Sequence, residues 1–464
     1  MQAENKKNKE MQIRTRNTLF YLLGGLLALT SLFSCGVDRW PEYYPWTGRD
    51  LWIDSVMRED YLWYEEIPSF DDLNYFLEPQ SFLDAAKSEK DNGISSVDTL
   101  LTASTPSYGF DYSLSQVPDN DTAYYAMVTY VVPESPAAEA GLKRGEWIMM
   151  VNNDYITKKN ETILTEGESK DIVIGKYTVH TETGEDGTET ETAEVVKDRE
   201  SVLPATRPVT DAVIPASTII QHNNSNIGYL VYNSFDTESD TQLLEFSKTC
   251  ATNNVKDFVL DLRYNAGGDM ESVQRLACIL APSDKLGGTL ATLQYNQKKS
   301  GKNHDLIFDA QLLVGGSNLN LSTVYILTSG TTAGAAEMLI NSLTPYMKVI
   351  VVGETTKGEY IGTERFENTQ FMWALRLAVC EIFNARGTAN YTNGFTPSYS
   401  VSPLSDPATV LPLGDPKEAL LSAALGIIDG SISLDGSETT RATNAANVKE
   451  VKMKRTFPRG IIVR

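Results

Sequence analysis

The stretch from Val324 to Gly362 constrains the possible fold more than any other part of the chain. A β-branched, apolar run at Val324–Leu327 ends in small residues, a helix-compatible segment follows at Ala335–Leu343, and a second β-branched run follows at Val349–Val352. Two strands that are joined through a helix are expected to lie parallel in one sheet. Because the carboxyl ends of parallel strands meet at one edge, the turn after the first strand and the loop after the second are expected to form a site there.

The two connections carry motifs that resemble those of the C-terminal processing (tail-specific) serine peptidases. The residues that keep the frame of a T-A-S-A-S-E type motif are Thr332, Ala333, Ala335 and Glu337. The second connection keeps the frame of a G-E-T-x-x-G-K motif over residues 353–358. In that family the serine between the two alanines of the first motif is the nucleophile, and the lysine of the second motif is its general base. The resemblance therefore implies that Gly334 stands at the nucleophile position and Glu359 at the base position, so that both catalytic groups are lost.

The double loss removes the chemistry of a serine–lysine dyad. A serine hydroxyl is a poor nucleophile until a base takes its proton, and a buried lysine with a lowered pKa is such a base. Two nearby residues could replace the missing groups. Ser329, at the end of the first strand, could replace the nucleophile, and Lys357, two residues before Glu359, could replace the base. The simpler interpretation is that Ser329 is an ordinary turn serine and that Lys357 is a solvated loop lysine.

A glycine motif precedes this region in the chain. Residues 261–268 read D-L-R-Y-N-A-G-G after a β-rich run, and a helix-compatible segment follows at Glu271–Leu280. This run is similar to a hallmark of the same family, in which a glycine N–H at this place helps to form the oxyanion hole. The resemblance implies that role for Gly267 or Gly268. The alternative is a simple glycine turn between a strand and a helix.

Two stretches farther upstream resemble a PDZ domain. Residues 107–111 read S-Y-G-F-D, which is similar to a Gly-Phe loop, and residues 135–148 read S-P-A-A-E-A-G-L-K-R-G-E-W-I. In PDZ domains free N–H groups beside the Gly-Phe loop bind a C-terminal carboxylate, and the peptide adds as a strand. The resemblance implies peptide binding at Tyr108, Gly109 and Phe110. The alternative is that Gly109 is only a turn glycine, and Asp111 would repel a carboxylate.

The patterns together predict a multidomain α/β (α+β) protein. We expect a small helical N-terminal domain over residues 35–100, with an amphipathic helix over Leu51–Tyr64, and a PDZ-like domain over residues 105–215. The acidic stretch Thr181–Glu194 is expected to be a hairpin tip or a mobile loop within that domain. The resemblance implies a peptidase-like domain with a crotonase-like ββα-type core over residues 220–428. A flexible tail is expected over residues 429–464, with disorder to about residue 448 and room for the last residues to dock.

The amino terminus is expected to address the protein to the cell envelope. Basic residues precede an apolar run at Leu19–Phe33, which is typical of a secretory signal over residues 1–34. The run ends in L-F-S-C-G, which resembles a bacterial lipobox with Cys35 as the lipidated residue. The alternative is a plain signal peptide with an incidental cysteine. We expect a lipid-anchored protein of the outer membrane or of the periplasmic or extracellular face, with the membrane touched only through the lipid.

Composition narrows the classes of partner and cofactor. The formal net charge of −21 argues against nucleic acid and against docking on anionic headgroups through charge. The remaining cysteines, Cys250, Cys278 and Cys380, form no C-x-x-C pair and are expected to be small buried apolar residues rather than a metal site. We therefore expect no metal and no cofactor, and we expect peptide or unfolded-protein C-termini as partners.

Three functions compete on these grounds. The preferred one is a catalytically degenerate homologue that binds peptides without cutting them. The second is an active serine-type endopeptidase that cleaves unfolded or C-terminally tagged proteins through a relocated pair, Ser329 with Lys357. The third is a hydrolase in which Glu359 activates a water molecule, and it requires Glu359 to be buried with a raised pKa.

Overall fold

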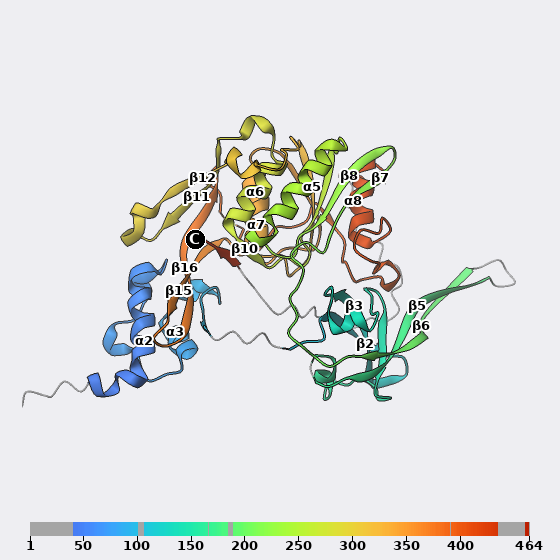
Figure 1. Ribbon diagram of the computed structural model, residues 1–464, viewed down its shortest axis with the longest axis horizontal. Helices are drawn as coiled ribbons and strands as arrows, with labels where there is room; N and C mark the ends of the chain where they lie inside the picture. Colours follow the sequence, from blue (N-terminus) through green and yellow to red (C-terminus); the bar gives the residue numbers. More distant parts are fainter. Residues whose placement is uncertain are drawn as a thin grey trace, which may run out of the picture.

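The computed structural model describes residues 40–100, 106–165, 167–183, 189–389, 391–434 and 460–463. The described residues form three sheets, and Figure 1 shows the N-terminal helices and the PDZ-like sheet on opposite sides below the peptidase-like layers. The predicted signal peptide, Cys35 and most of the predicted tail lie outside the described residues. Among the described helices, none combines the length and the apolar character that a membrane crossing requires.

The N-terminal segment shares its core with the peptidase-like domain. Helix α2 spans Trp40–Asp60, helix α3 spans Pro79–Ala86 and strand β1 spans Ser96–Thr99. The expected helix is therefore present, although α2 begins and ends earlier than Leu51–Tyr64. Ile53 and Met57, four residues apart on α2, are fully buried and join the same hydrophobic cluster as the central helices. Strand β1 pairs antiparallel with β16 (Trp373–Asn384), which fixes the segment to that sheet.

The PDZ-like sheet is a consecutive antiparallel arrangement of five strands. These strands are β2 (Phe110–Val117), β3 (Asn120–Val131), β4 (Trp147–Val151), β5 (Lys170–Thr183) and β6 (Glu189–Leu203). Helix α4 covers Pro136–Glu139, and a 3-10 helix, η4, covers Glu161–Leu164. The acidic stretch is confirmed as part of a hairpin, because β5 and β6 pair from Lys170 with Leu203 out to Thr183 with Glu189. Strand β2 forms one edge of this sheet.

The second sheet contains the predicted strand–helix–strand unit. Its order is β17 (Tyr399–Ser400), β14 (Lys348–Gly353), β13 (Thr323–Thr328), β9 (Asp257–Asp261), β8 (Ser225–Val231) and β7 (Ala216–His222). Strands β13 and β14 are parallel and flank the chain path through α7 (Ala335–Leu343), which confirms the expected pairing. Helices α5 (Asp240–Thr252), α6 (Met270–Leu280) and α7 pack on one face, and α8 (Ala419–Asp429) packs on the other.

Alternation along the strands explains why both faces are covered. Leu260 and Ile326 belong to the cluster that contains α6 and α7, whereas Val259 and Leu327 belong to the cluster that contains α8. Successive side chains of a strand point to opposite faces, so a strand that is apolar at every position needs a helix on each side. The uninterrupted apolar run of β13 therefore places this strand in the middle of the layered domain.

The third sheet brings distant parts of the chain together. Its order is β10 (Gly267–Asp269), β18 (Gly460–Ile462), β15 (Ile361–Asn368), β16, β11 (Thr289–Tyr295) and β12 (His304–Ile307), and β1 pairs with β16. The remaining short 3-10 helices are Tyr64–Glu66, Phe70–Asp72, Glu89–Asp91, Thr237–Ser239, Ser283–Lys285, Gln297–Lys302, Ala310–Leu313 and Pro407–Thr409. The prediction of a flexible tail over residues 429–464 left room for the last residues to dock, and in the structure they do, because β18 pairs on both sides and Ile461 is fully buried. The three cysteines of the folded part are free and buried, as expected.

Candidate active site

Gly334 holds a backbone conformation that suits a residue on a sharp turn. It precedes helix α7 with φ of 57° and ψ of −116°, a region that glycine adopts more readily than other residues. A nucleophile at the start of a helix commonly stands on such a strained strand-to-helix turn, where its side chain is presented to the site. Gly334 keeps the turn but has no side chain to present.

The carboxylate of Glu337 connects the two loops at the end of the sheet. It accepts hydrogen bonds from the backbone N–H groups of Gly334 at 3.1 Å, Gly358 at 2.7 Å and Glu359 at 2.7 Å. The hydroxyl of Thr356 also donates to it. The side chain is fully buried, and this burial raises the pKa of Glu337 to about 7 although the donated hydrogen bonds oppose the shift. One buried carboxylate therefore holds the position of the nucleophile beside the position of the base.

Ser329 serves the structure of the turn. Its side chain is fully buried, and its hydroxyl donates to the carbonyl oxygen of Arg263. The Ser329 hydroxyl oxygen accepts from the N–H of Thr331 at 3.3 Å, and the Ser329 N–H donates to the Thr332 hydroxyl at 3.0 Å. These contacts are those of a turn serine whose proton is already committed to a backbone acceptor.

Lys357 and Glu359 form an ion pair with each other. The Lys357 ammonium lies 2.5 Å from a carboxylate oxygen of Glu359, and about half of the lysine side chain, 52%, is exposed. The Glu359 side chain is 17% exposed. The structure describes both Ser329 and Lys357, and no hydrogen bond or ion pair joins them. The Lys357 backbone N–H donates to the Thr332 carbonyl at 2.9 Å, so the two loops touch through the main chain.

The glycine loop is closed by its own asparagine. The Gly267 N–H donates to Oδ1 of Asn265 at 2.9 Å, and the Asn265 carbonyl accepts from the N–H of Ala333 at 3.0 Å. Gly268 has φ of 138°, and a Cβ at this residue would lie 2.0 Å from the Phe235 carbonyl oxygen, so only glycine fits there. The loop therefore lies next to the nucleophile position, as the family pattern implies, with the Gly267 N–H bound inside the chain.

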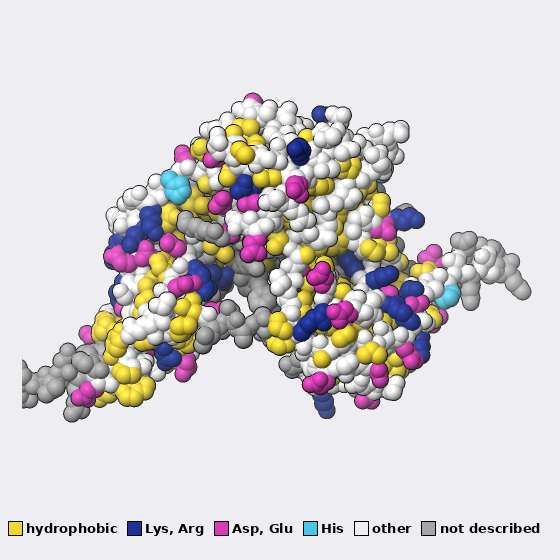
Figure 2. All heavy atoms as spheres, in the orientation of Figure 1, with side chains coloured by type: hydrophobic (Ala, Val, Ile, Leu, Met, Phe, Trp, Pro, Cys, Tyr) yellow, Lys and Arg dark blue, Asp and Glu magenta, His cyan; other side chains and the backbone are white. Residues whose placement is uncertain are grey.

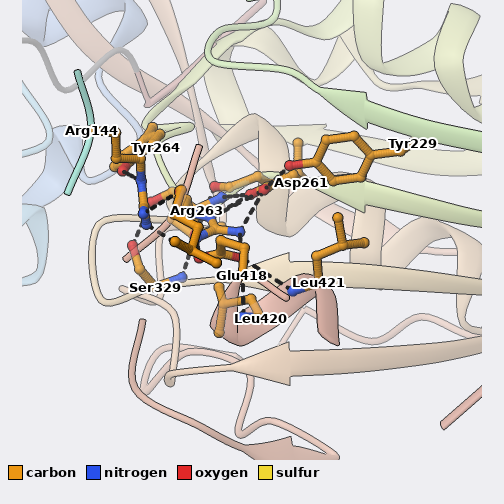
Figure 3. Close-up of polar contacts among 12 residues, drawn as sticks. Arg144, Tyr229, Asp261, Arg263, Tyr264, Ser329, Glu418, Leu420 and Leu421 are labelled. Carbon is orange, nitrogen blue, oxygen red and sulfur yellow. Dashed lines mark hydrogen bonds and ion pairs between the residues drawn. The ribbon is translucent and has the colours of Figure 1, made fainter. Parts of the chain in front are cut away.

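A buried ionic network lies at the residues that directly precede the glycine loop (Figure 3). Arg263 is fully buried and donates to Asp261, with Nε 2.9 Å from Oδ1 and Nη2 2.7 Å from Oδ2. It also donates to both carboxylate oxygens of Glu418, at 2.8 Å on Oε2. Burial raises the pKa of Glu418, but the charge and hydrogen bonds of Arg263 outweigh it, so the pKa lies below its usual range. Glu418 also accepts from the first N–H groups of α8, at Leu420 and Leu421.

The same network reaches into the PDZ-like sheet. Arg144 donates to Oε1 of Glu418 at 3.2 Å, to the Leu411 carbonyl at 2.8 Å and to the Tyr264 hydroxyl at 3.3 Å. The Tyr264 hydroxyl in turn donates to the Thr129 carbonyl on β3 at 2.6 Å. Arg263 and Tyr264 directly precede Asn265, so the PDZ-like domain contacts the residues that shape the glycine loop.

The predicted peptide-binding loop lies at the start of β2. Tyr108 is fully buried, Gly109 has φ of 77°, and Phe110 begins the strand. A Cβ on Gly109 would lie 2.3 Å from Cβ of Ser135, so the loop packs tightly on the start of α4. Because β2 is an edge strand, a peptide could extend the sheet along it. Tyr112 of β2 donates to Glu161 of η4 at 2.7 Å, so this strand is held to the 3-10 helix.

Reasoning from the sequence missed several residues that build this region. Glu337 was recognised as part of a motif, but the pattern gives no sign that its carboxylate binds the second loop. Arg144 lies within the PDZ-type motif without a signal for its contact with the peptidase-like domain. Glu418 directly precedes a predicted helix, where a carboxylate commonly caps the first N–H groups. This position is the one sequence signal for a structural role of Glu418. Its pairing with a residue 155 positions away has no local signal.

Comparisons with known proteins agree with this architecture. Residues 226–401 match the model of peptidase family S41, residues 50–113 match the peptidase S41 N-terminal domain, and residues 127–163 match a PDZ domain. A crystal structure of a Bacteroides fragilis protein assigned to the S41 proteases aligns with a TM-score of 0.78 and 45% sequence identity. The alignment covers 82% of this chain and 98% of that structure.

More distant relatives carry names that refer to C-terminal processing. A carboxyl-terminal-processing protease of Picosynechococcus is 25% identical over 236 residues, which cover 51% of this chain and 51% of that protein. The carboxy-terminal processing protease CtpA of Bacillus subtilis is 24% identical over 320 residues, which cover 68% of this chain and 57% of that protein. The chain spans about half the length of the curated relatives it matches.

Proposed function

The chain belongs to peptidase family S41, and from this premise we propose that it is a catalytically degenerate member that binds peptide C-termini without cleaving them. One observation carries the proposal. The buried carboxylate of Glu337 holds the loops of both catalytic positions in register, yet those positions are Gly334 and Glu359. The two loops keep their arrangement although neither a nucleophile nor an amine base stands on them, which supports a role in binding rather than in cleavage.

The relocated pair is not favoured by the contacts of its two members. Activation of Ser329 would require a base within hydrogen-bond reach of its hydroxyl, but that hydroxyl donates to the Arg263 carbonyl. Lys357 is paired with Glu359 and is half exposed, whereas a general-base amine must face the nucleophile and be free to take its proton. The same ion pair speaks against Glu359 as a base for water, because a carboxylate oxygen of Glu359 is already engaged by the Lys357 ammonium at 2.5 Å.

Peptide binding is supported by the edge strand of the PDZ-like sheet. Strand β2 follows the Gly-Phe loop and has a partner only on the β3 side within the described sheet. A peptide that adds along β2 would gain main-chain hydrogen bonds, and its terminal carboxylate would approach the loop at Gly109. The names of the distant relatives, which refer to C-terminal processing, point to the same class of ligand.

The layering of the peptidase-like domain also bears on its fold type. Helices α6 and α7 lie in the hydrophobic cluster that joins the second, mostly parallel sheet to the third sheet. This arrangement supports the proposed crotonase-like ββα-type core.

An envelope location is part of the proposal. Cys35 stands at the lipidation position of a lipobox-like sequence a few residues before α2 begins. Exposed aromatic side chains gather at this end of the protein, with Trp46 and Phe76 each 60% exposed and Phe70 44% exposed. Figure 2 shows hydrophobic side chains on the surface over the region of α2. Aromatic rings favour the boundary between water and lipid, so this end suits a position beside the membrane to which the lipid would hold it.

Peptide binding can be tested with residues 37–464 and a fluorescent decapeptide that ends in an apolar residue. We expect saturable binding with a free C-terminal carboxylate and at least tenfold weaker binding when that carboxylate is amidated. The variant Gly109→Ala should lose binding, because its Cβ would meet Ser135. Gly141→Ala is the matched control, since Gly141 also has a positive φ but no atom within 4 Å of the added Cβ. Equal binding of the free and amidated peptides would refute carboxylate recognition.

A further inference from the structure

The C-terminal strand β18 fills a gap between two other strands. In the described part of the third sheet the order is β10, β18, β15, so β10 and β15 are joined only through residues Gly460–Ile462. Both pairings are parallel: Ile461 lies opposite Gly268 on one side and opposite Gly362 on the other. Without β18 each neighbouring strand would present an open edge, and an open edge accepts an extended peptide.

The gap is shaped for apolar side chains. Ile461 is fully buried and Val463 is 3% exposed, whereas Ile462 between them is only half-buried. A Cβ on Gly362 would lie 2.7 Å from Cγ2 of Val463 and 2.5 Å from Sγ of Cys380, so the absence of a side chain there makes room for the valine. Alternate residues of the bound strand are thus buried, which gives the gap a side-chain preference.

Main-chain hydrogen bonds fix the register of the strand. The Val463 N–H donates to the Thr363 carbonyl at 2.8 Å, and the Thr363 hydroxyl donates to the Ile461 carbonyl at 2.8 Å. On the other side, Phe235 occupies the opposite edge of β10, because its N–H donates to the Gly267 carbonyl at 3.0 Å and its carbonyl accepts from Asp269 at 2.9 Å. Main-chain groups of successive strand residues alternate in direction, so the amide of Gly268 is directed toward β18.

The composition of the tail favours its association with this protein. Residues 449–464 contain several Lys and Arg and a single Glu, whereas the whole chain has a net charge of −21. A basic segment is attracted to an acidic body, and this attraction speeds the encounter in cis or in trans.

We propose that the gap between β10 and β15 is a second peptide-binding site, whose ligand is an extended peptide segment with β-branched residues at alternate positions. The chain's own segment 460–463 is its resident ligand. The site differs from the PDZ-like edge because the ligand is added as a parallel strand between two strands, next to the glycine loop. It goes beyond the proposed function and does not depend on it, since neither Gly334 nor the PDZ-like domain contributes to the site.

Exchange of the resident strand tests the proposal with the complete folded protein. A recognition sequence for a site-specific protease is placed between residues 435 and 459, so that cleavage leaves the terminal segment held without a covalent link. The probe is a fluorescent peptide with the sequence of residues 458–464, PRGIIVR. A peptide with aspartate at the position of Ile461 is the control ligand. Circular dichroism before and after cleavage reports whether the body remains folded.

We expect the labelled peptide to enter the cleaved protein with a stoichiometry near one and to raise its Tm as the peptide concentration increases. The uncut protein should bind it at least a hundredfold more weakly, and the aspartate peptide should not bind. The variant Gly362→Ala should weaken binding at least tenfold, whereas Gly301→Ala, which has no atom within 4 Å of its added Cβ, should not. Two results would overturn the proposal. The first is that the peptide does not exchange with the resident segment over days at a hundredfold excess. The second is that the segment is lost and the folded body still does not take up the peptide.

Discussion

The carboxylate of Glu337, on helix α7, lies 2.7 Å from the backbone nitrogen of Glu359 and accepts its N–H. Glu359 belongs to the loop after β14 and stands at the position of the family's lysine. The same carboxylate accepts from Gly334, the position of the family's serine. The two positions that the resemblance assigns to the serine and the lysine are thus held together by one buried carboxylate. The consequences can be tested by changing each of these residues in turn.

Restoring both catalytic groups should restore cleavage. In the double variant Gly334→Ser, Glu359→Lys, the serine would stand on the turn at the start of α7, and the new amine would lie near Lys357, whose charge lowers the pKa of a neighbouring amine. We expect cleavage of an unfolded tagged protein at least tenfold above that of the unaltered chain, measured by mass spectrometry of the products. Each single variant is the control and should remain at background. A folded but inactive double variant would show that the frame has lost more than the dyad.

Loss of one acceptor oxygen of Glu337 should destabilise the fold. In Glu337→Gln one carboxylate oxygen becomes an amide that cannot accept, so at least one buried N–H among Gly334, Gly358 and Glu359 loses its partner. An unsatisfied buried donor costs about 1–3 kcal/mol in the free energy of unfolding. Urea unfolding measures this loss, and Glu367→Gln at an exposed site should change stability by less than about 0.5 kcal/mol. Equal effects of the two substitutions would argue against the proposed contacts.

The pH dependence of stability should also report Glu337. Its pKa is about 7 in the folded chain and near 4.5 in the unfolded chain, so the folded state retains a proton that the unfolded state releases between these values. The contribution of this group is therefore fully present below about pH 4.5 and is lost as the pH rises to about 7. We expect the free energy of unfolding of the unaltered chain to fall relative to that of Glu337→Gln across this window. A difference that stays flat would show that the burial of the carboxylate is balanced by its hydrogen bonds.

The ionic network below the site should be far more sensitive than a surface ion pair. Glu418→Gln removes a charge that faces the fully buried Arg263, and a broken buried ion pair typically costs about 3–5 kcal/mol. The exposed pair Arg365–Glu367 is the matched control, and its loss should cost no more than about 1 kcal/mol. Thermal unfolding followed by circular dichroism checks both. A small effect of Glu418→Gln would mean that Asp261 alone is sufficient to hold the arginine.

The sequence predicted the parts of this protein that depend on local pattern. The unit around β13, α7 and β14 was predictable because β-branched runs and a helical segment follow one another within a short span, and the structure confirms their parallel pairing. The glycine at 268 was predictable as a place of close backbone approach, and the Phe235 carbonyl is the group that approaches it. The hairpin that contains the acidic stretch was predictable from its polar composition between two β-rich runs.

The missing parts depend on contacts between distant residues. Glu418 caps a helix that the sequence predicts, but its choice of Arg263 as partner is made by the fold of the whole domain. The terminal run Ile461–Val463 is too short for periodicity to reveal a strand, and its neighbours, β10 and β15, lie far upstream in the chain. The roles of Ser329 and Lys357 could not be separated by spacing alone, because the direction of each side chain is set by the turn that carries it.

Cleavage of an unfolded, C-terminally tagged protein tests the central claim most directly. Residues 37–464 and the variant Ser329→Ala are incubated with the tagged protein, and the products are followed by mass spectrometry while a pull-down measures retention. We predict no cleavage by either protein, together with retention of the tagged protein by both. Cleavage by the unaltered chain that disappears in Ser329→Ala would contradict the account and would establish Ser329 as a relocated nucleophile.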